Sequence, residues 1–116
     1  MQEIVIVGGG AAGMMAAARL QGKDARIHLF ERNEKLGKKL FITGKGRCNL
    51  TNACELSELM NAIVSNGKFM YSSLQAFDNH AVMDYFEQDL GLRLKTERGN
   101  RVFPASDHSS DVLRAL

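Results

Sequence analysis

Six residues near the N-terminus have the types and the spacing that bind the phosphates of a dinucleotide. Glycine occupies positions 8, 10 and 13 of the stretch Gly-Gly-Gly-Ala-Ala-Gly. In this spacing the first glycine permits a tight turn, the second lets the backbone approach a pyrophosphate, and the third lets a helix pack closely on a strand. The predicted chemistry is anion binding by backbone N–H groups. The candidate residues are Gly8, Gly9, Gly10, Ala11, Ala12 and Gly13.

An acidic residue follows the glycines at the distance that a ribose contact requires. Glu31 lies about 20 residues further along the chain, at the end of an apolar stretch, where a carboxylate can accept hydrogen bonds from two ribose hydroxyls. The same carboxylate argues against NADP, because it would repel a 2′-phosphate. FAD and NAD both remain open at this point.

A basic segment that contains glycines, residues 37–52, comes next. It has no Asp or Glu, and its cations are Lys38, Lys39, Lys45 and Arg47. Cations beside a pyrophosphate offset its charge, and glycines let backbone N–H groups face a ligand. A plain NAD domain would continue quickly into a helix and a third apolar strand. This polar loop therefore favours a flavoprotein that binds FAD over an NAD-dependent dehydrogenase.

The two cysteines have no spacing typical of a metal or redox pair, so no metal site is predicted. Cys48 follows Arg47, which leaves two interpretations: a thiol with a lowered pKa, or a structural thiol beside the cofactor, which we favour. We identify no acid–base residue, so the catalytic residues stay unassigned. Four basic residues are expected to face solvent on a hairpin: Arg93, Lys95, Arg98 and Arg101.

A strand, a turn and a helix are needed to position the glycine stretch. Apolar β-branched residues predict a strand over 3–7, buried on both faces, and strong helix formers predict a helix over 14–20. A second strand is predicted over 25–31. Together they form a parallel βαβ unit, which makes the fold class α/β with a Rossmann-like start.

Further elements are predicted beyond the basic segment. Apolar periodicity and turn residues favour a helical turn near 35–40, helices over 56–63, 71–77, 80–90 and 111–116, and strands over 92–96 and 101–103. Thr51 or Asn52 is expected to cap the helix over 56–63, and Ser109 or Ser110 the last helix.

Composition narrows the classes of protein. The chain has 116 residues, 45% of them hydrophobic, and a formal net charge of +2. It lacks an apolar run of roughly 20 residues, so no membrane span is predicted. A net charge this small does not indicate nucleic-acid binding. Two cysteines without an export signal favour a cytoplasmic protein with reduced thiols.

Three blocks of sequence together resemble a bacterial flavoprotein family, often called HI0933-like or BaiN-like, whose members include an aminoacetone oxidase and a bile-acid-intermediate reductase. The blocks are residues 8–14, 31–39 and 43–52. Shorter resemblances at 71–72, 101–107 and 111–113 extend the likeness over nearly the whole chain. The Thr-Gly-Lys-Gly-Arg-Cys-Asn block over 43–49 is far more specific than the glycine stretch.

The resemblance implies an FAD-dependent oxidoreductase with a two-dinucleotide-fold architecture. It places the pyrophosphate on residues 8–13 and the ribose on Glu31. Residues near the adenosine and phosphate half would be Arg32, Lys38 and Lys39, and those near the isoalloxazine would be Gly46, Arg47, Cys48 and Asn49. The implied substrate is a small molecule, with NAD(P)H as a candidate electron donor and no nucleic acid.

Family members are several times longer than this chain. Residues 1–116 are therefore expected to be the N-terminal part of an incomplete FAD-binding domain, inactive by itself. Three alternatives stay open: an NAD-dependent dehydrogenase domain, a non-catalytic nucleotide-binding fragment, and a flavin-dependent protein that modifies tRNA.

Overall fold

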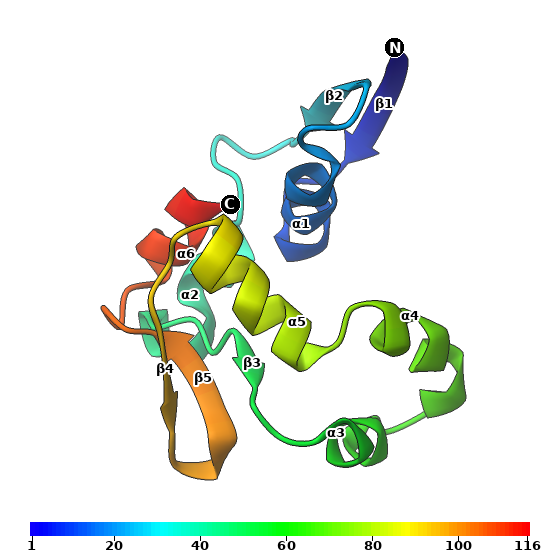
Figure 1. Ribbon diagram of the computed structural model, residues 1–116. Coiled ribbons are helices and arrows are strands. Elements are labelled where there is room, and N and C mark those ends of the chain that lie inside the picture. The colour runs from blue at the N-terminus through cyan, green and yellow to red at the C-terminus, as the bar shows by residue number, and fades with distance from the viewer.

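The computed structural model describes residues 1–116 and begins with a parallel βαβ unit (Figure 1). Strands β1 (Gln2–Val7) and β2 (Ala25–Phe30) pair in parallel, and helix α1 (Ala11–Leu20) connects them. The predicted α/β class is confirmed. Helix α1 begins at Ala11, earlier than predicted, because Ala11 and Ala12 are strong helix formers and Gly10 already takes the N-cap position.

The two faces of the β1–β2 sheet differ in burial. Residues at alternate positions that face α1, such as Ile4 and Ile6, are partly buried. On the opposite face, Val5 is 61% exposed and Val7 is 85% exposed, and Phe30 lies opposite Val7 in the register. The prediction that the first strand is buried on both faces is wrong for residues 1–116, because α1 covers one face and no element packs on the other.

A second sheet forms from three short antiparallel strands. Its order is β3 (Thr51–Asn52), β5 (Arg101–Pro104) and β4 (Leu94–Glu97), and a turn over Arg98–Asn100 joins β4 to β5. The predicted hairpin is confirmed with slightly shifted ends. The prediction that Thr51 or Asn52 caps the next helix is wrong, because both residues pair with β5 instead.

Short helices make up the rest of the chain. They are α2 (Lys38–Ile42), η1 (Thr43–Gly46), α3 (Leu56–Ala62), η2 (Gly67–Met70), α4 (Tyr71–Ala76), α5 (Asn79–Asp84) with its π-helical extension η3 (Tyr85–Asp89), and α6 (Ser109–Ala115). Asp78 caps α5 by accepting a hydrogen bond from the Ala81 N–H at 2.8 Å. Since α6 already begins at Ser109, neither predicted serine serves as its cap, and His108 takes the N-cap position. None of these helices combines the length and hydropathy needed to cross a bilayer.

The buried core lies where α5, α6 and the antiparallel sheet meet, below the βαβ unit in Figure 1. Val102 and Val112 are fully buried there, and Phe86 is 1% exposed. Arg19 of α1 connects the βαβ unit to the residues on either side of α5: its guanidinium lies 4.7 Å from the ring centre of Phe77, which precedes α5, and 4.9 Å from that of Tyr85, the first residue of η3. The two halves that flank the candidate site are thereby held together.

Candidate cofactor site

The glycine turn leaves the start of α1 free to bind an anion. The N–H groups of Ala11, Ala12 and Gly13 donate to no protein acceptor, and the N-cap residue Gly10 has no side chain to offer them. A methyl group at Gly13 would lie 1.9 Å from the Gly8 carbonyl oxygen, so glycine is required there for packing. A methyl group at Gly10 would meet nothing within 4 Å, so its space is open to a ligand.

Glu31 holds the glycine turn in place. One carboxylate oxygen accepts a hydrogen bond from the Gly9 N–H at 2.9 Å, and the other accepts one from the Asn33 N–H at 2.7 Å. The bond from Asn33 and then the bond from Gly9 lower the pKa of Glu31 below its usual value, so the group is ionised at neutral pH. Each carboxylate oxygen can accept a second hydrogen bond, which leaves capacity for ribose hydroxyls.

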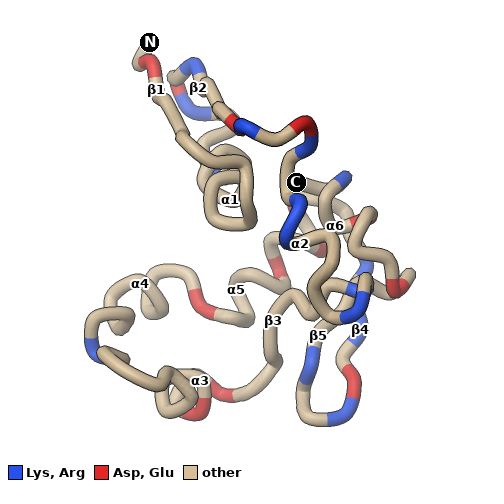
Figure 2. The backbone as a smooth tube through the Cα atoms, turned by 180° about the vertical axis from the view of Figure 1, so that it is seen from behind, with Lys and Arg blue, Asp and Glu red and all other residues tan.

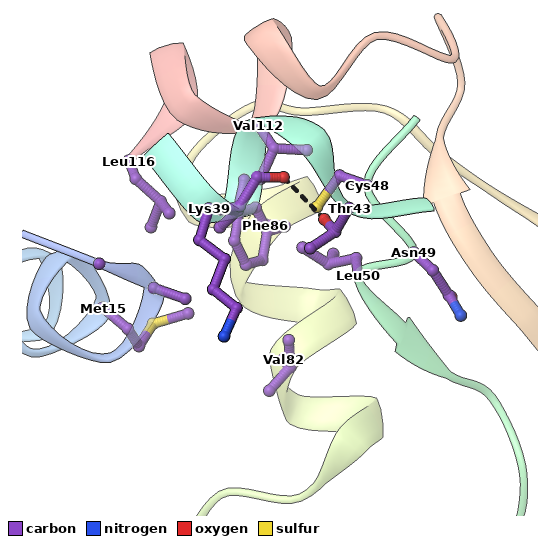
Figure 3. A pocket seen from close by; sticks show the side chains of 13 residues that line it. Met15, Lys39, Thr43, Cys48, Asn49, Leu50, Val82, Phe86, Val112 and Leu116 are labelled. Carbon is purple, nitrogen blue, oxygen red and sulfur yellow. Dashed lines mark hydrogen bonds between the residues drawn. The ribbon is translucent and has the colours of Figure 1, made fainter. Parts of the chain in front are cut away.

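A cavity of about 420 Å³ opens beside the glycine turn (Figure 3). The N-terminus of α1, helix α2, the segment after it, α5 and α6 form its walls. The lining residues are Gly10, Ala11, Met15, Lys39, Leu40, Thr43, Cys48, Asn49, Leu50, Val82, Phe86, Val112 and Leu116. Five of them were predicted from sequence as cofactor residues: Gly10, Ala11, Lys39, Cys48 and Asn49.

Lys39 brings an unpaired positive charge to this cavity, and Figure 3 shows its side chain extended along the cavity wall. It forms no ion pair, because every side-chain ion pair of the chain uses another cation. Arg32 and Lys38 are also unpaired and line a separate hollow of about 370 Å³. The cations predicted for the adenosine and phosphate half of the cofactor are therefore divided between two places.

Cys48 is a buried free thiol. It is 3% exposed and has a φ of +58°, and burial raises its pKa, an effect that hydrogen bonding with the Thr43 side chain partly offsets. The alternative interpretation, a thiol whose pKa is lowered by its neighbour Arg47, is wrong. The Arg47 guanidinium instead donates hydrogen bonds to two carboxylates, and Arg47 is not among the groups that shift the pKa of the thiol.

Arg47 lies outside the cavity in a ring of four charges. Its Nε donates to Asp107 at 2.7 Å and its Nη2 to Glu97 at 2.5 Å. The Lys95 ammonium lies 2.7 Å from Asp107 and 3.0 Å from Glu97. The expectation that Lys95 simply faces solvent is wrong, because both carboxylates draw it into the ring. In Figure 2 the β4–β5 hairpin contains both basic and acidic residues.

The remaining predicted residues lie outside the cavity. Those that do not line it are Gly8, Gly9, Ala12, Gly13, Glu31, Arg32, Lys38, Gly46 and Arg47. Asn49 lines the cavity, but its amide points to the antiparallel sheet: with the nitrogen turned toward carbonyl oxygens, it donates to Thr51 at 3.1 Å and to Val102 at 3.2 Å.

Sequence reasoning missed most of the apolar wall. Val82 and Phe86 lie within the helix predicted over 80–90, but no local signal showed which surface that helix would line. The residues missed are Met15, Leu40, Thr43, Leu50, Val82, Phe86, Val112 and Leu116. No group of three or more His, Cys, Asp or Glu side chains lies where a metal ion would be held.

A βαβ unit with a glycine turn at a helix N-terminus, an acidic residue after the second strand and unpaired cations beside the turn define a Rossmann-type nucleotide-binding domain. Residues 2–116 match the family model described as the HI0933-like protein Rossmann domain, and the chain belongs to that family. The resemblance and fold class predicted from sequence are thereby confirmed.

Three relatives are similar over parts of their own length. The 3-dehydro-bile acid delta(4,6)-reductase of Clostridium scindens is 40% identical over 122 aligned residues, which cover all of this chain and 28% of the relative. The ribosomal RNA dihydrouridine synthase of Haemophilus influenzae is 31% identical, covering 77% of this chain and 24% of the relative. The Escherichia coli protein of the same name is 40% identical over 50 residues. The chain thus spans about a quarter of the first two relatives.

Proposed function

We propose that residues 1–116 form the first part of an FAD-binding domain in a flavoprotein oxidoreductase. One observation carries the proposal: the free N–H groups at the start of α1 and the unpaired Lys39 ammonium lie beside one cavity, whose far wall is apolar. Donors of this kind bind phosphate, and an apolar wall suits a flat ring system. A dinucleotide with an aromatic head presents both chemistries.

The residues divide between the parts of FAD. The backbone at Gly10 and Ala11, with Lys39, would bind the pyrophosphate, and Glu31 would accept hydrogen bonds from the adenosine ribose. Cys48 and Asn49 would border the isoalloxazine. When bound, FAD supplies hydride or electron transfer, and the residues of this chain bind and orient it and keep water from its ring. No residue within 1–116 is assigned a catalytic role.

Two substitutions test this assignment. Gly10→Ala places a methyl group in the open cradle, and Lys39→Met removes one charge while keeping an unbranched side chain. We expect Lys39→Met to weaken FAD binding by about 1.5–3 kcal/mol, on the order of tenfold to a hundredfold in Kd, since it removes a charged hydrogen bond. Gly10→Ala should weaken binding while costing the fold no more than about 1 kcal/mol, the scale of an N-cap change.

Lys23→Met is the matched control, because Lys23 is exposed and unpaired and lies before β2, at the opposite end of the strands from the glycine turn. Titration of the purified natural protein with FAD, followed by flavin fluorescence, measures all three variants. Equal Kd values for Lys39→Met and Lys23→Met would contradict the phosphate assignment. A colourless protein that retains NAD would instead favour the dehydrogenase alternative.

For the substrate we propose a small molecule, in line with the name of the bile-acid relative. NAD(P)H is the proposed electron donor. RNA is the second candidate. Two relatives are named as ribosomal RNA dihydrouridine synthases, and Arg32 and Lys38, which line the separate hollow of about 370 Å³, are unpaired cations. Binding of an rRNA fragment that weakens steeply with salt, and weakens further in Lys38→Met, would favour RNA.

A further inference from the structure

The ring of charges around Arg47 connects three separate parts of the chain. Arg47 follows η1, Glu97 and Lys95 belong to β4, and Asp107 lies in the turn between β5 and α6. Two cations and two anions alternate, so each charge has an opposite neighbour on both sides. The Arg47 guanidinium also lies over the Phe103 ring, 3.9 Å from its centre.

The segment held by this ring has an unusual backbone. Lys45 and Cys48 have φ values of +57° and +58°, in the left-handed region that side chains other than glycine rarely adopt. Such conformations persist where their surroundings impose them. Here the Arg47 N–H donates to Gly44 and the Cys48 N–H to Thr43, both at 3.1 Å, and the Leu50 N–H donates to Val102 at 2.8 Å.

Each charge of the ring is paired with other members of the ring. Arg47 directs both Nε and Nη2 at carboxylates, and neither it nor its three partners line the cavity. Lys39 lines the cavity and is unpaired. The two residues are both cations of the same basic segment, yet only one has a charge available to a ligand.

We propose that Arg47 is a positioning residue: the ring with Asp107, Glu97 and Lys95 fixes the backbone of residues 43–50 so that Thr43, Cys48 and Leu50 form the cavity wall, and Arg47 does not touch the cofactor. The proposal rests on the proposed function. It predicts that removing either member of the Arg47–Asp107 pair has the same consequence for FAD.

The experiment is a double-mutant cycle in the natural protein with Arg47→Gln and Asp107→Asn. Asparagine is chosen because Asp107 has a φ of +62°, which asparagine tolerates. We expect each single variant to raise the Kd for FAD by about three- to tenfold. The Kd of the double variant should not exceed the higher of the two single-variant values, as for residues that act as a unit. Lys23→Met again serves as the unaffected control.

Direct contact between Arg47 and the cofactor gives a different pattern. Asp107→Asn would then release the Nε of the guanidinium from its partner and leave FAD binding unchanged or tighter, while Arg47→Gln alone would weaken it. That result would overturn the proposal, as would unchanged binding in both variants. If Arg47→Gln does not fold, Asp107→Asn decides by itself: weaker binding supports the proposal, and equal or tighter binding contradicts it.

A measurement without cofactor separates this proposal from the proposed function. Hydrogen exchange of the Cys48 and Leu50 amides should be faster in both single variants than in the unsubstituted protein, because the segment loses its support. Unchanged exchange would overturn the ring's positioning role. Absence of FAD binding in the unsubstituted protein would refute the proposed function and leave the exchange result to judge the ring.

Discussion

Chemically similar residues have different roles in this chain because their surroundings differ. Gly13 is required by the backbone that it packs against, whereas Gly10 leaves open space. Lys39 presents a free charge, whereas the charge of Arg47 is paired twice. Their functions follow from these contacts more than from residue type.

Cys48 gives a prediction at this scale. It is buried and its pKa is raised, whereas Cys54 is partly exposed. Since the thiolate is the reactive form, we expect Cys48 to react with a maleimide on the order of tenfold or more slowly than Cys54 near neutral pH. The Cys54→Ser and Cys48→Ala changes each leave one thiol within residues 1–116, which allows the two rates to be measured separately. Equal rates would show that the Cys48 site opens freely.

The sequence was sufficient to place residues whose role depends on local spacing. The glycine turn over residues 8–10 joins the first strand to α1, and Glu31 follows the second strand, both as predicted, whereas the hydrogen bond from the Gly9 N–H to Glu31 was not predicted. The pairing of Arg47 with Asp107 joins residues 60 positions apart. Sequence periodicity does not indicate contacts between residues so far apart in the sequence. Arg47 was therefore predicted to lie near the flavin.

At the scale of elements, the antiparallel sheet decides how the loop after α2 is shaped. Strand β3 is two residues long and was missed, because a run this short has no alternation to detect. It nevertheless joins the loop to β5 and so to the hairpin that carries the charged ring. Strand pairing therefore joins the β4–β5 hairpin and the loop after α2 into one unit.

This unit should loosen in acid. Lys95 and Arg47 lower the pKa values of Asp107 and Glu97 below their ordinary values of 3.8 and 4.5. Groups whose pKa is lower in the folded state stabilise it fully above about pH 4.5, and lose that effect as the pH falls through the lowered values. The contribution is modest, since the side chains are 30% to 42% exposed.

An Asp107→Asn/Glu97→Gln protein measures this effect, because it lacks both titrations. We expect it to be less stable than the unsubstituted protein at pH 7, with the difference shrinking below pH 4.5. Urea unfolding at a series of pH values provides the comparison, and Glu31 titrates equally in both proteins. A difference that stays constant down to pH 3 would show that the ion pairs do not stabilise the fold.

For the whole molecule, the core is small for the chain length. Only 13 of 116 residues are buried, and the radius of gyration is 14.8 Å, against about 13 Å for a folded domain of this size. The outer face of the β1–β2 sheet also exposes apolar side chains. The prediction of a strand buried on both faces failed here, because such burial requires elements that residues 1–116 do not contain.

The open arrangement predicts weak behaviour of residues 1–116 in isolation. We expect the free energy of unfolding of this segment to be near or below about 5 kcal/mol, the lower end of the range for folded domains. We also expect the segment to bind FAD weakly or not at all. Denaturant unfolding and FAD titration of the segment, compared with the natural protein, provide the measurement. A cooperative, stable segment with tight FAD binding would contradict the interpretation that it is part of a larger domain.

The bond between the Gly9 N–H and Glu31 has a consequence for how fast a ligand is captured. Gly9 is held from two sides, by the Glu31 carboxylate and by the Gly37 N–H that donates to its carbonyl oxygen at 2.7 Å. The turn is thereby preorganised, and little conformational entropy remains to be lost on binding. Association with a phosphate ligand should be a single step whose rate rises linearly with ligand concentration, without the plateau of a slow rearrangement.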